Sequence, residues 1–128
     1  LAKDIMVTGS KLPKIGYKKT LGEVLKIINQ KKLGIVVVMK NNYIAGLVTD
    51  GDLRREKFIS KKTNLQKLMT KNPFIVDESM PATKALGIMS EKKITSLLVA
   101  SDKDFKKKNK IKLKGIIHIH SLLKYGLK

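Results

Sequence analysis

The most constraining feature of this sequence is an internal repeat, because a duplicated chain has to build the same set of secondary-structure elements twice. Residues 20–33 align without a gap on residues 81–94, and residues 34–38 align on residues 95–99, at an offset of 61 positions. Gly46 and Gly115 differ by 69 positions, so the second copy has gained eight residues, which lie in the lysine-rich run 103–114. We therefore divide the chain into two repeats, residues 1–62 and 63–128.

Hydrophobic periodicity predicts the same elements in both repeats. In the first repeat, apolar residues at helical spacing predict a helix over 21–32, β-branched runs predict strands over 35–39 and 43–48, and a second helix follows over 51–59. In the second, we expect a short helical turn at 65–69, strands at 74–76, 96–100 and 113–119, and helices at 81–92 and from residue 121. Each repeat is thus predicted to have the order β-α-β-β-α, in an α/β (α+β) fold.

Three of the predicted helices carry start signals. Thr20 is a suitable N-cap for the first helix, and Glu23 three residues later completes a capping box. Asp50 occupies the position expected for the N-cap of the second helix. Two roles therefore remain for this residue: it caps the helix, or it contacts a ligand. Pro81 is expected at the first position of its helix, where proline is tolerated.

The amino-acid composition limits the classes of protein to which this chain can belong. With 42% hydrophobic residues in 128, the chain suits one compact domain or two small halves that share a core. The sequence has no cysteine and no apolar run near the roughly 20 residues that span a bilayer, so we expect a cytoplasmic protein without a membrane partner. Because it begins at Leu1, we expect a piece of a longer protein.

The net charge of +18 raises the possibility of nucleic-acid binding. Of the 28 basic residues, however, Arg54 and Arg55 are the only arginines, and the lysines are scattered along the whole chain. The densest lysine cluster, residues 103–114, has Phe105 as its one aromatic neighbour and offers no stacking platform. We interpret this cluster as a solvated hairpin tip and do not expect a nucleic-acid partner.

Several strings resemble a known family. The segment 49–55 (Thr-Asp-Gly-Asp-Leu-Arg-Arg), the segment 68–73, the pair Leu33-Gly34 and the segment 115–120 are similar to paired cystathionine β-synthase (CBS) domains, the Bateman module. The resemblance is closer still to the CBS pair at the C-terminus of bacterial arabinose 5-phosphate isomerases. It covers the whole chain and implies two repeats packed sheet to sheet, which associate as a homodimer through the CBS modules.

The resemblance also implies a function. The parent enzyme would interconvert D-arabinose 5-phosphate and D-ribulose 5-phosphate for the synthesis of Kdo, the acidic sugar of lipopolysaccharide. That chemistry belongs to a sugar isomerase (SIS) domain, which we do not find here, and the chain shows no convincing acid–base pair of its own. We expect no catalysis from this chain, no required cofactor and no metal, but a regulatory ligand such as AMP, ATP or the cytidine sugar nucleotide CMP-Kdo.

In such modules the ligand lies in the cleft between the two repeats, and its contacts carry over to positions in the first repeat. By analogy, Thr49 would lie near phosphate and Asp52 on the ribose hydroxyls, while Ile15, Gly34 and Ile35 would line the base pocket. Asp50, next to Thr49 in the sequence, is a further candidate for nucleotide contact. Arg54 and Arg55 would suit a phosphate or carboxylate, although a solvent-facing role on a helix explains them equally well.

The second repeat departs from the motif. His118 stands where threonine belongs and Ser121 where aspartate belongs, so a second nucleotide site is doubtful. A metal interpretation of His118 and His120 lacks a third ligand, and we favour a structural or ligand-facing role. Two alternatives to ligand binding remain: a subunit-assembly module in which Thr49 and Asp52 only cap a helix, and salt-sensitive nucleic-acid association.

Overall fold

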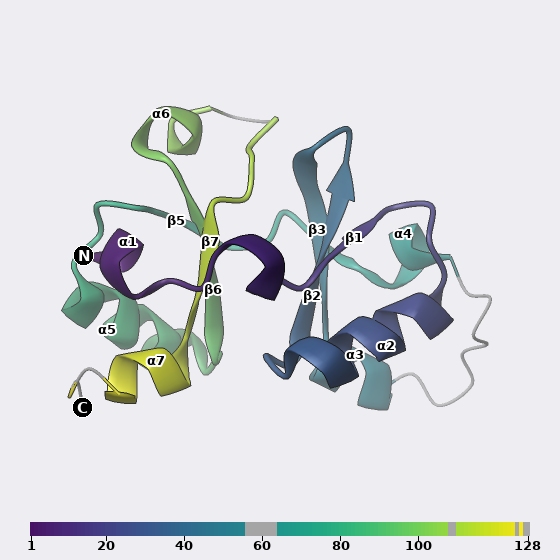
Figure 1. Ribbon diagram of the computed structural model, residues 1–128, viewed down its shortest axis with the longest axis horizontal. Coiled ribbons are helices and arrows are strands. Elements are labelled where there is room, and N and C mark those ends of the chain that lie inside the picture. Colours follow the sequence, from purple (N-terminus) through teal and green to yellow (C-terminus); the bar gives the residue numbers. More distant parts are fainter. Residues whose placement is uncertain (56–63, 108–109, 125, 127–128) are drawn as a thin grey trace. The chain divides into compact units, whose positions relative to one another are not determined.

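The computed structural model describes residues 1–55, 64–107, 110–124 and 126 (Figure 1). The chain forms two compact units, one made of Pro13–Pro73 and the other of Leu1–Leu12 together with Phe74–Lys128. Each unit contains one β-sheet and its own helices. The α+β class predicted from the sequence is confirmed.

The unit Pro13–Pro73 is built on a four-stranded sheet with the order β1-β2-β3-β4. Its first pair is parallel and the other two are antiparallel. The strands are β1 (Lys14–Gly16), β2 (Ile35–Lys40), β3 (Tyr43–Thr49) and β4 (Thr70–Lys71), and the helices are α2 (Leu21–Lys31), α3 (Asp50–Arg55) and α4 (Leu65–Leu68).

Helix α2 confirms the helix predicted for the first repeat. The Glu23 carboxylate accepts a hydrogen bond from the backbone N–H of Thr20 at 3.1 Å, as expected of a capping box. Lys32, with φ of 59°, ends the helix in the left-handed conformation. The predicted hairpin is confirmed too, because Asn41 and Asn42 at its turn have φ of 52° and 68°, a conformation that asparagine tolerates well.

The helix-facing side of this sheet forms the core of the unit. Alternate strand residues point to one face, so Val36 and Val38 of β2 pack with Val48 of β3 against the apolar side of α2. The cluster of buried residues consists of Ile15, Leu21, Val24, Ile28, Val36, Val38, Val48 and Leu65.

The other unit is built on a three-stranded sheet with the order β5-β6-β7. Its strands are β5 (Ile75–Asp77), β6 (Ser96–Ala100) and β7 (Gly115–His118), and its helices are α1 (Ala2–Ile5), α5 (Ala82–Lys92), α6 (Asp102–Phe105) and α7 (Ile119–Lys124), with a 3-10 turn, η1, at Gly9–Lys11. The core gathers Ala2, Ile5, Val76, Ala85, Met89, Leu97, Val99, Ile117 and Leu122.

The two repeats exchange their leading segments. Val7 of the first repeat bridges Ile116 on β7, so residues 1–12 complete the unit that holds the body of the second repeat. Conversely, β4 of the second repeat pairs with β3 of the first, where Lys71 lies opposite Gly46. The predicted division at residues 62 and 63 stays a prediction about the sequence repeats, because the compact units cross it.

Several local predictions need correction. The segment predicted to be a solvated hairpin tip does join the antiparallel strands β6 and β7, and its described lysines are exposed, but it also contains the unpredicted helix α6, whose N-cap Ser101 accepts a hydrogen bond from the Asp104 N–H at 3.1 Å. Pro81 is the N-cap of α5 and not its first residue, and α7 begins at Ile119, two residues earlier than expected. The end of the helix predicted for 51–59 lies outside the described residues.

No helix in the described part of the chain has the length and apolar character required to cross a membrane.

Candidate ligand-binding site

The candidate site begins where β3 runs into α3, and its central feature is a reciprocal pair of hydrogen bonds. The backbone N–H of Thr49 donates to Asp52 Oδ2 at 3.0 Å, and the backbone N–H of Asp52 donates to Thr49 Oγ1 at 3.1 Å. This is a capping box in which aspartate takes the place of the usual glutamate. The expectation that Asp50 is the N-cap is therefore wrong, because α3 starts at Asp50 and Thr49 caps it.

The capping box fixes the two residues that the family resemblance assigns to a ligand. A threonine hydroxyl that accepts one hydrogen bond can still donate its own proton, and a carboxylate has about four acceptor positions. Thr49 and Asp52 are both partly buried. The box therefore holds the two side chains in place and is chemically compatible with a polar ligand.

Gly34 lies directly beside this turn. Its carbonyl accepts a hydrogen bond from the Asp50 N–H at 2.9 Å, and its φ of 73° favours glycine. A Cβ atom at this position would lie 3.2 Å from Asp50 Oδ2. Ile35, the next residue, pairs with Thr49 across the β2–β3 ladder. The structure thus brings together Gly34, Ile35, Thr49, Asp50 and Asp52.

Ile15 stands apart from that group. It lies opposite Val38 on β1 and packs in the core cluster that faces α2, whereas Ile35 and Thr49 belong to the other face of the sheet. Arg54 is exposed on α3, and the side chain of Arg55 lies outside the described residues. The role of each in binding stays a prediction.

The matching turn of the second repeat keeps the backbone contact but changes the side chains. The Ile119 N–H donates to the carbonyl of Thr95 at 2.8 Å, which repeats the contact between Asp50 and Gly34. His118 takes the place of Thr49, and its Nδ1 accepts a hydrogen bond from the His120 N–H at 3.2 Å. Ser121, at the position of Asp52, is partly buried. Capping is kept here by an imidazole instead of a hydroxyl.

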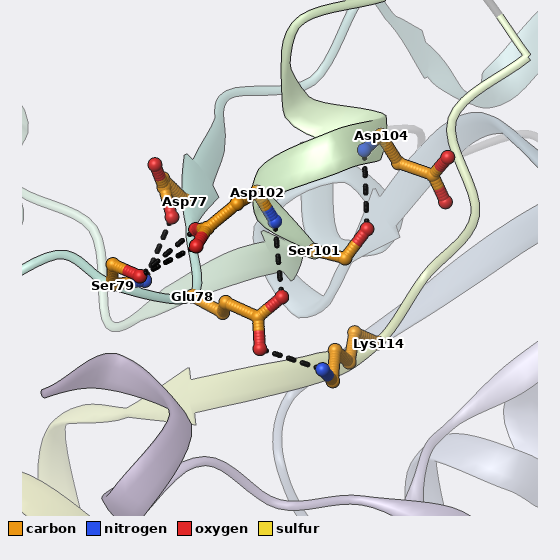
Figure 2. Close-up of polar contacts among 7 residues, drawn as sticks. All are labelled: Asp77, Glu78, Ser79, Ser101, Asp102, Asp104 and Lys114. Atoms are coloured by element: carbon orange, nitrogen blue, oxygen red, sulfur yellow. Dashed lines mark hydrogen bonds and ion pairs between the residues drawn. The ribbon is translucent and has the colours of Figure 1, made fainter.

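A second polar cluster, which the sequence did not predict, joins the end of β5 to the start of α6 (Figure 2). Ser79 Oγ donates to the Asp102 carboxylate at 2.8 Å, and the Ser79 N–H donates to Asp77 Oδ1 at 2.7 Å. Glu78 accepts from the Asp102 N–H at 3.0 Å and from Lys114 Nζ at 2.6 Å. The cluster fastens the inserted segment of the second repeat to the strand beside it.

Electrostatics in this cluster follow from these contacts. A side-chain hydrogen bond between Asp77 and Asp102 raises the pKa of Asp77 and lowers the pKa of Asp102. A hydrogen bond from Ser79 lowers the pKa of Asp102 further. Lys114 is the main cause that lowers the pKa of Glu78. Within the described residues, no group of three or more His, Cys, Asp or Glu side chains is arranged to hold a metal ion. We interpret the cluster as a structural contact that links β5 to the inserted segment.

Comparisons with known proteins agree with the geometry. The family described as CBS domain matches residues 2–58 and 65–128. The arabinose 5-phosphate isomerase KdsD of Yersinia pestis is 35% identical over 128 residues, which cover 97% of this chain and 37% of that protein. The chain therefore spans little more than a third of the length of this curated relative.

Solved structures show the same fold. The crystal structure of CBSX2 in complex with AMP matches with a TM-score of 0.79 and 24% identity, and covers 98% of this chain and 94% of that chain. The CBS domain of the bacterial CNNM/CorC family Mg²⁺ transporter in complex with ATP matches with a TM-score of 0.75 and 17% identity, over 98% and 87%.

Proposed function

Because this chain belongs to the CBS domain family, we propose that it is a regulatory, nucleotide-binding CBS pair of an arabinose 5-phosphate isomerase. The observation that carries the proposal is its 35% identity to KdsD of Yersinia pestis over 97% of its length. Isomerisation of D-arabinose 5-phosphate is assigned to a sugar isomerase domain elsewhere in the parent protein. In this account the parent is a cytoplasmic homodimer, associated through its CBS repeats.

The proposed ligand is an adenine nucleotide. Two structures with this fold, CBSX2 and the CNNM/CorC transporter domain, are complexes with AMP and ATP. The turn of the first repeat offers matching chemistry, since the Thr49 hydroxyl can donate to a phosphate oxygen and the Asp52 carboxylate can accept from ribose hydroxyls. Charged hydrogen bonds of this kind contribute roughly 1.5 to 3 kcal/mol each.

The side chains of the two turns support placing the ligand at the first repeat. A side chain at position 34 would crowd Asp50, because a Cβ atom there would lie 3.2 Å from the Asp50 carboxylate. At the second repeat, His118 and Ser121 stand in place of Thr49 and Asp52, so that turn lacks the carboxylate proposed to accept from ribose hydroxyls. We therefore assign the nucleotide to Gly34, Ile35, Thr49, Asp50 and Asp52.

A thermal-shift screen of the chain tests the proposal. We expect AMP or ATP to raise the melting temperature in both low and high salt, because a ligand that binds only the folded state stabilises it. CMP-Kdo is the competing ligand, and a shift from it alone would reassign the site to a sugar nucleotide. Stabilisation by every polyanion tested, lost at high salt, would indicate binding to the lysine surface. No shift from any ligand would favour the subunit-assembly role.

A further inference from the structure

His118 occupies an unusual position for a histidine. It ends β7, is only 7% exposed, and its Nδ1 accepts the backbone N–H of His120 at 3.2 Å. A ring nitrogen accepts a hydrogen bond only through its lone pair, so this contact requires a neutral imidazole that carries its proton on Nε2. The contact that starts α7 therefore depends on the protonation state of one side chain.

The surroundings of His118 offer little to stabilise a charged ring. The ring of His120 lies edge-on with its centroid 4.5 Å away. Ser96 is opposite His118 in the β6–β7 ladder, and its buried hydroxyl has no hydrogen-bond partner among the described residues. Within the described residues, the ring contact of His118 is thus with a second imidazole, and the residue paired with it across the ladder carries a hydroxyl; neither group is negatively charged.

Charged groups on the packed elements do not change this picture. Burial is the main cause that lowers the pKa of His118, and among the described residues the charge of His120 adds to the effect. The other charged residues on the described helices that pack on β7 and α7 are not among the causes of the shift; they are Lys3 and Asp4 on α1, Lys84, Glu91 and Lys92 on α5, and Lys124 on α7.

We propose that His118 is an acid-sensitive cap of α7. When a proton from solvent binds Nδ1, the His120 N–H loses its acceptor and the first turn of the helix is loosened. Helix α7 carries Leu122, which is fully buried in the core of this unit, so loosening the helix weakens that core. The matching helix α3 is capped by the Thr49 hydroxyl, which does not titrate in this range. Mild acid therefore acts on the second repeat alone, and the device works without any nucleotide.

The direction of the effect follows from linkage. Because the folded state holds the His118 pKa below its ordinary value, the unfolded state binds the proton more readily. The stabilisation from the neutral ring is complete above the ordinary range of histidine, about pH 6.5, and is lost as the pH falls through the folded-state pKa. Over the same interval, α7 should become progressively easier to open.

NMR titration of the chain together with hydrogen exchange tests the proposal. At neutral pH, long-range ¹H–¹⁵N spectra should show His118 with its proton on Nε2. As the pH is lowered from about 7.5 to 5, the His120 and Ser121 amides should exchange about fivefold faster than the intrinsic change in rate predicts, the factor that one hydrogen bond of typical strength supplies. The Asp52 amide, which is capped by Thr49, should not show this excess.

Two variants separate the cap from its neighbour. His118→Thr copies the residue of the first repeat and should abolish the acid-induced opening of α7, and His118→Asn supplies a second non-titrating acceptor if the threonine variant folds poorly. His120→Gln keeps the cap and should move the opening to higher pH, because the His120 charge lowers the His118 pKa. An opening that persists in both position-118 variants, or a His118 tautomer protonated on Nδ1 at neutral pH, would overturn the proposal.

Discussion

The Sδ atom of Met69 lies 2.6 Å from the position that a Cβ atom would occupy on Gly46, and the carbonyl oxygen of Thr70 lies 2.8 Å from the same point. The second repeat shows the same relationship, with Met6 Sδ at 2.5 Å from a Cβ on Gly115. In each case the glycine belongs to one repeat and the methionine to the leading segment of the other. These close approaches are where the exchanged segments dock on their sheets.

Replacing Gly46 with alanine should therefore destabilise the unit Pro13–Pro73. The added methyl group would meet backbone as well as a side chain, and overpacking of this kind typically costs about 1 to 3 kcal/mol. Gly87→Ala is the matched control: Gly87 is exposed on α5 with no atom within 4 Å of a new Cβ, so the change should stabilise the helix by about 0.5 to 1 kcal/mol. Denaturant unfolding measures both, and equal effects would contradict the docking role of Gly46.

Residues 1–12, the leading segment of the first repeat, should contribute mainly to the stability of the unit that holds the body of the second repeat. Ile5 is 9% exposed in the core with Leu122 and Ile117, so Ile5→Ala should cost about 2 to 4 kcal/mol. Hydrogen exchange should then show faster opening of β6 and β7. Leu123→Ala removes a side chain that is 53% exposed and should change stability by less than about 0.5 kcal/mol. If Ile5→Ala weakened only the strands β2 and β3, the exchange of segments would be refuted.

Local signals explain which parts of this fold could be predicted from the sequence. The first and last turns of α2 were predicted within one residue, because the Thr20–Glu23 box and the apolar spacing both lie within the helix itself. The hairpin turn at Asn41 and Asn42 was found for the same reason. Strand β6, a continuous apolar run, was predicted with its observed ends, Ser96–Ala100.

Features that depend on distant residues could not be predicted in this way. The exchange of leading segments rests on pairings such as Val7 with Ile116, which leave no local pattern. Helix α6 was missed because lysines dominated the interpretation of its segment, although Ser101 followed by two acidic residues was a readable start signal. In the candidate site, Thr49 and Asp52 contact each other, while their role in binding stays a prediction, and periodicity alone could not show that Ile15 belongs to the core-facing side of the sheet.

The ion pair between Glu78 and Lys114 predicts that the stability contributed by the second polar cluster depends on pH. Lys114 lowers the pKa of Glu78, so this contact stabilises the fold above the ordinary range of glutamate and is lost as the pH falls through the folded-state pKa. Lys114→Met should remove that stabilisation, lowering the melting temperature slightly at neutral pH and having little effect in acid. Added salt should reduce the difference, since the pair is partly exposed.

The control for this change is Lys103→Met, which removes the same charge. Lys103 is exposed on α6 and makes no hydrogen bond or ion pair within the described part of the chain. Its replacement should leave the pH dependence of the melting temperature as it is in the parent chain. Identical profiles for the two variants would mean that the loss of a positive charge, and not the contact with Glu78, sets the effect.

The capping boxes at Thr20 and Thr49 give the sharpest test of the proposed nucleotide site. Asp52→Ala and Glu23→Ala each remove a carboxylate that accepts an N-cap amide, at 3.0 and 3.1 Å respectively, so each should cost about 0.5 to 2 kcal/mol of stability. Only Asp52 belongs to the candidate site. The pair therefore separates loss of a helix cap from loss of a ligand contact.

Isothermal titration calorimetry of AMP binding to the parent chain and these two variants is the decisive measurement, made at a temperature where all three are folded. We predict that Glu23→Ala binds AMP with unchanged affinity and that Asp52→Ala loses at least about tenfold, the equivalent of 1.4 kcal/mol. Equal affinities for all three proteins would show that Asp52 is only a helix cap and would contradict the assignment of the nucleotide to the first repeat.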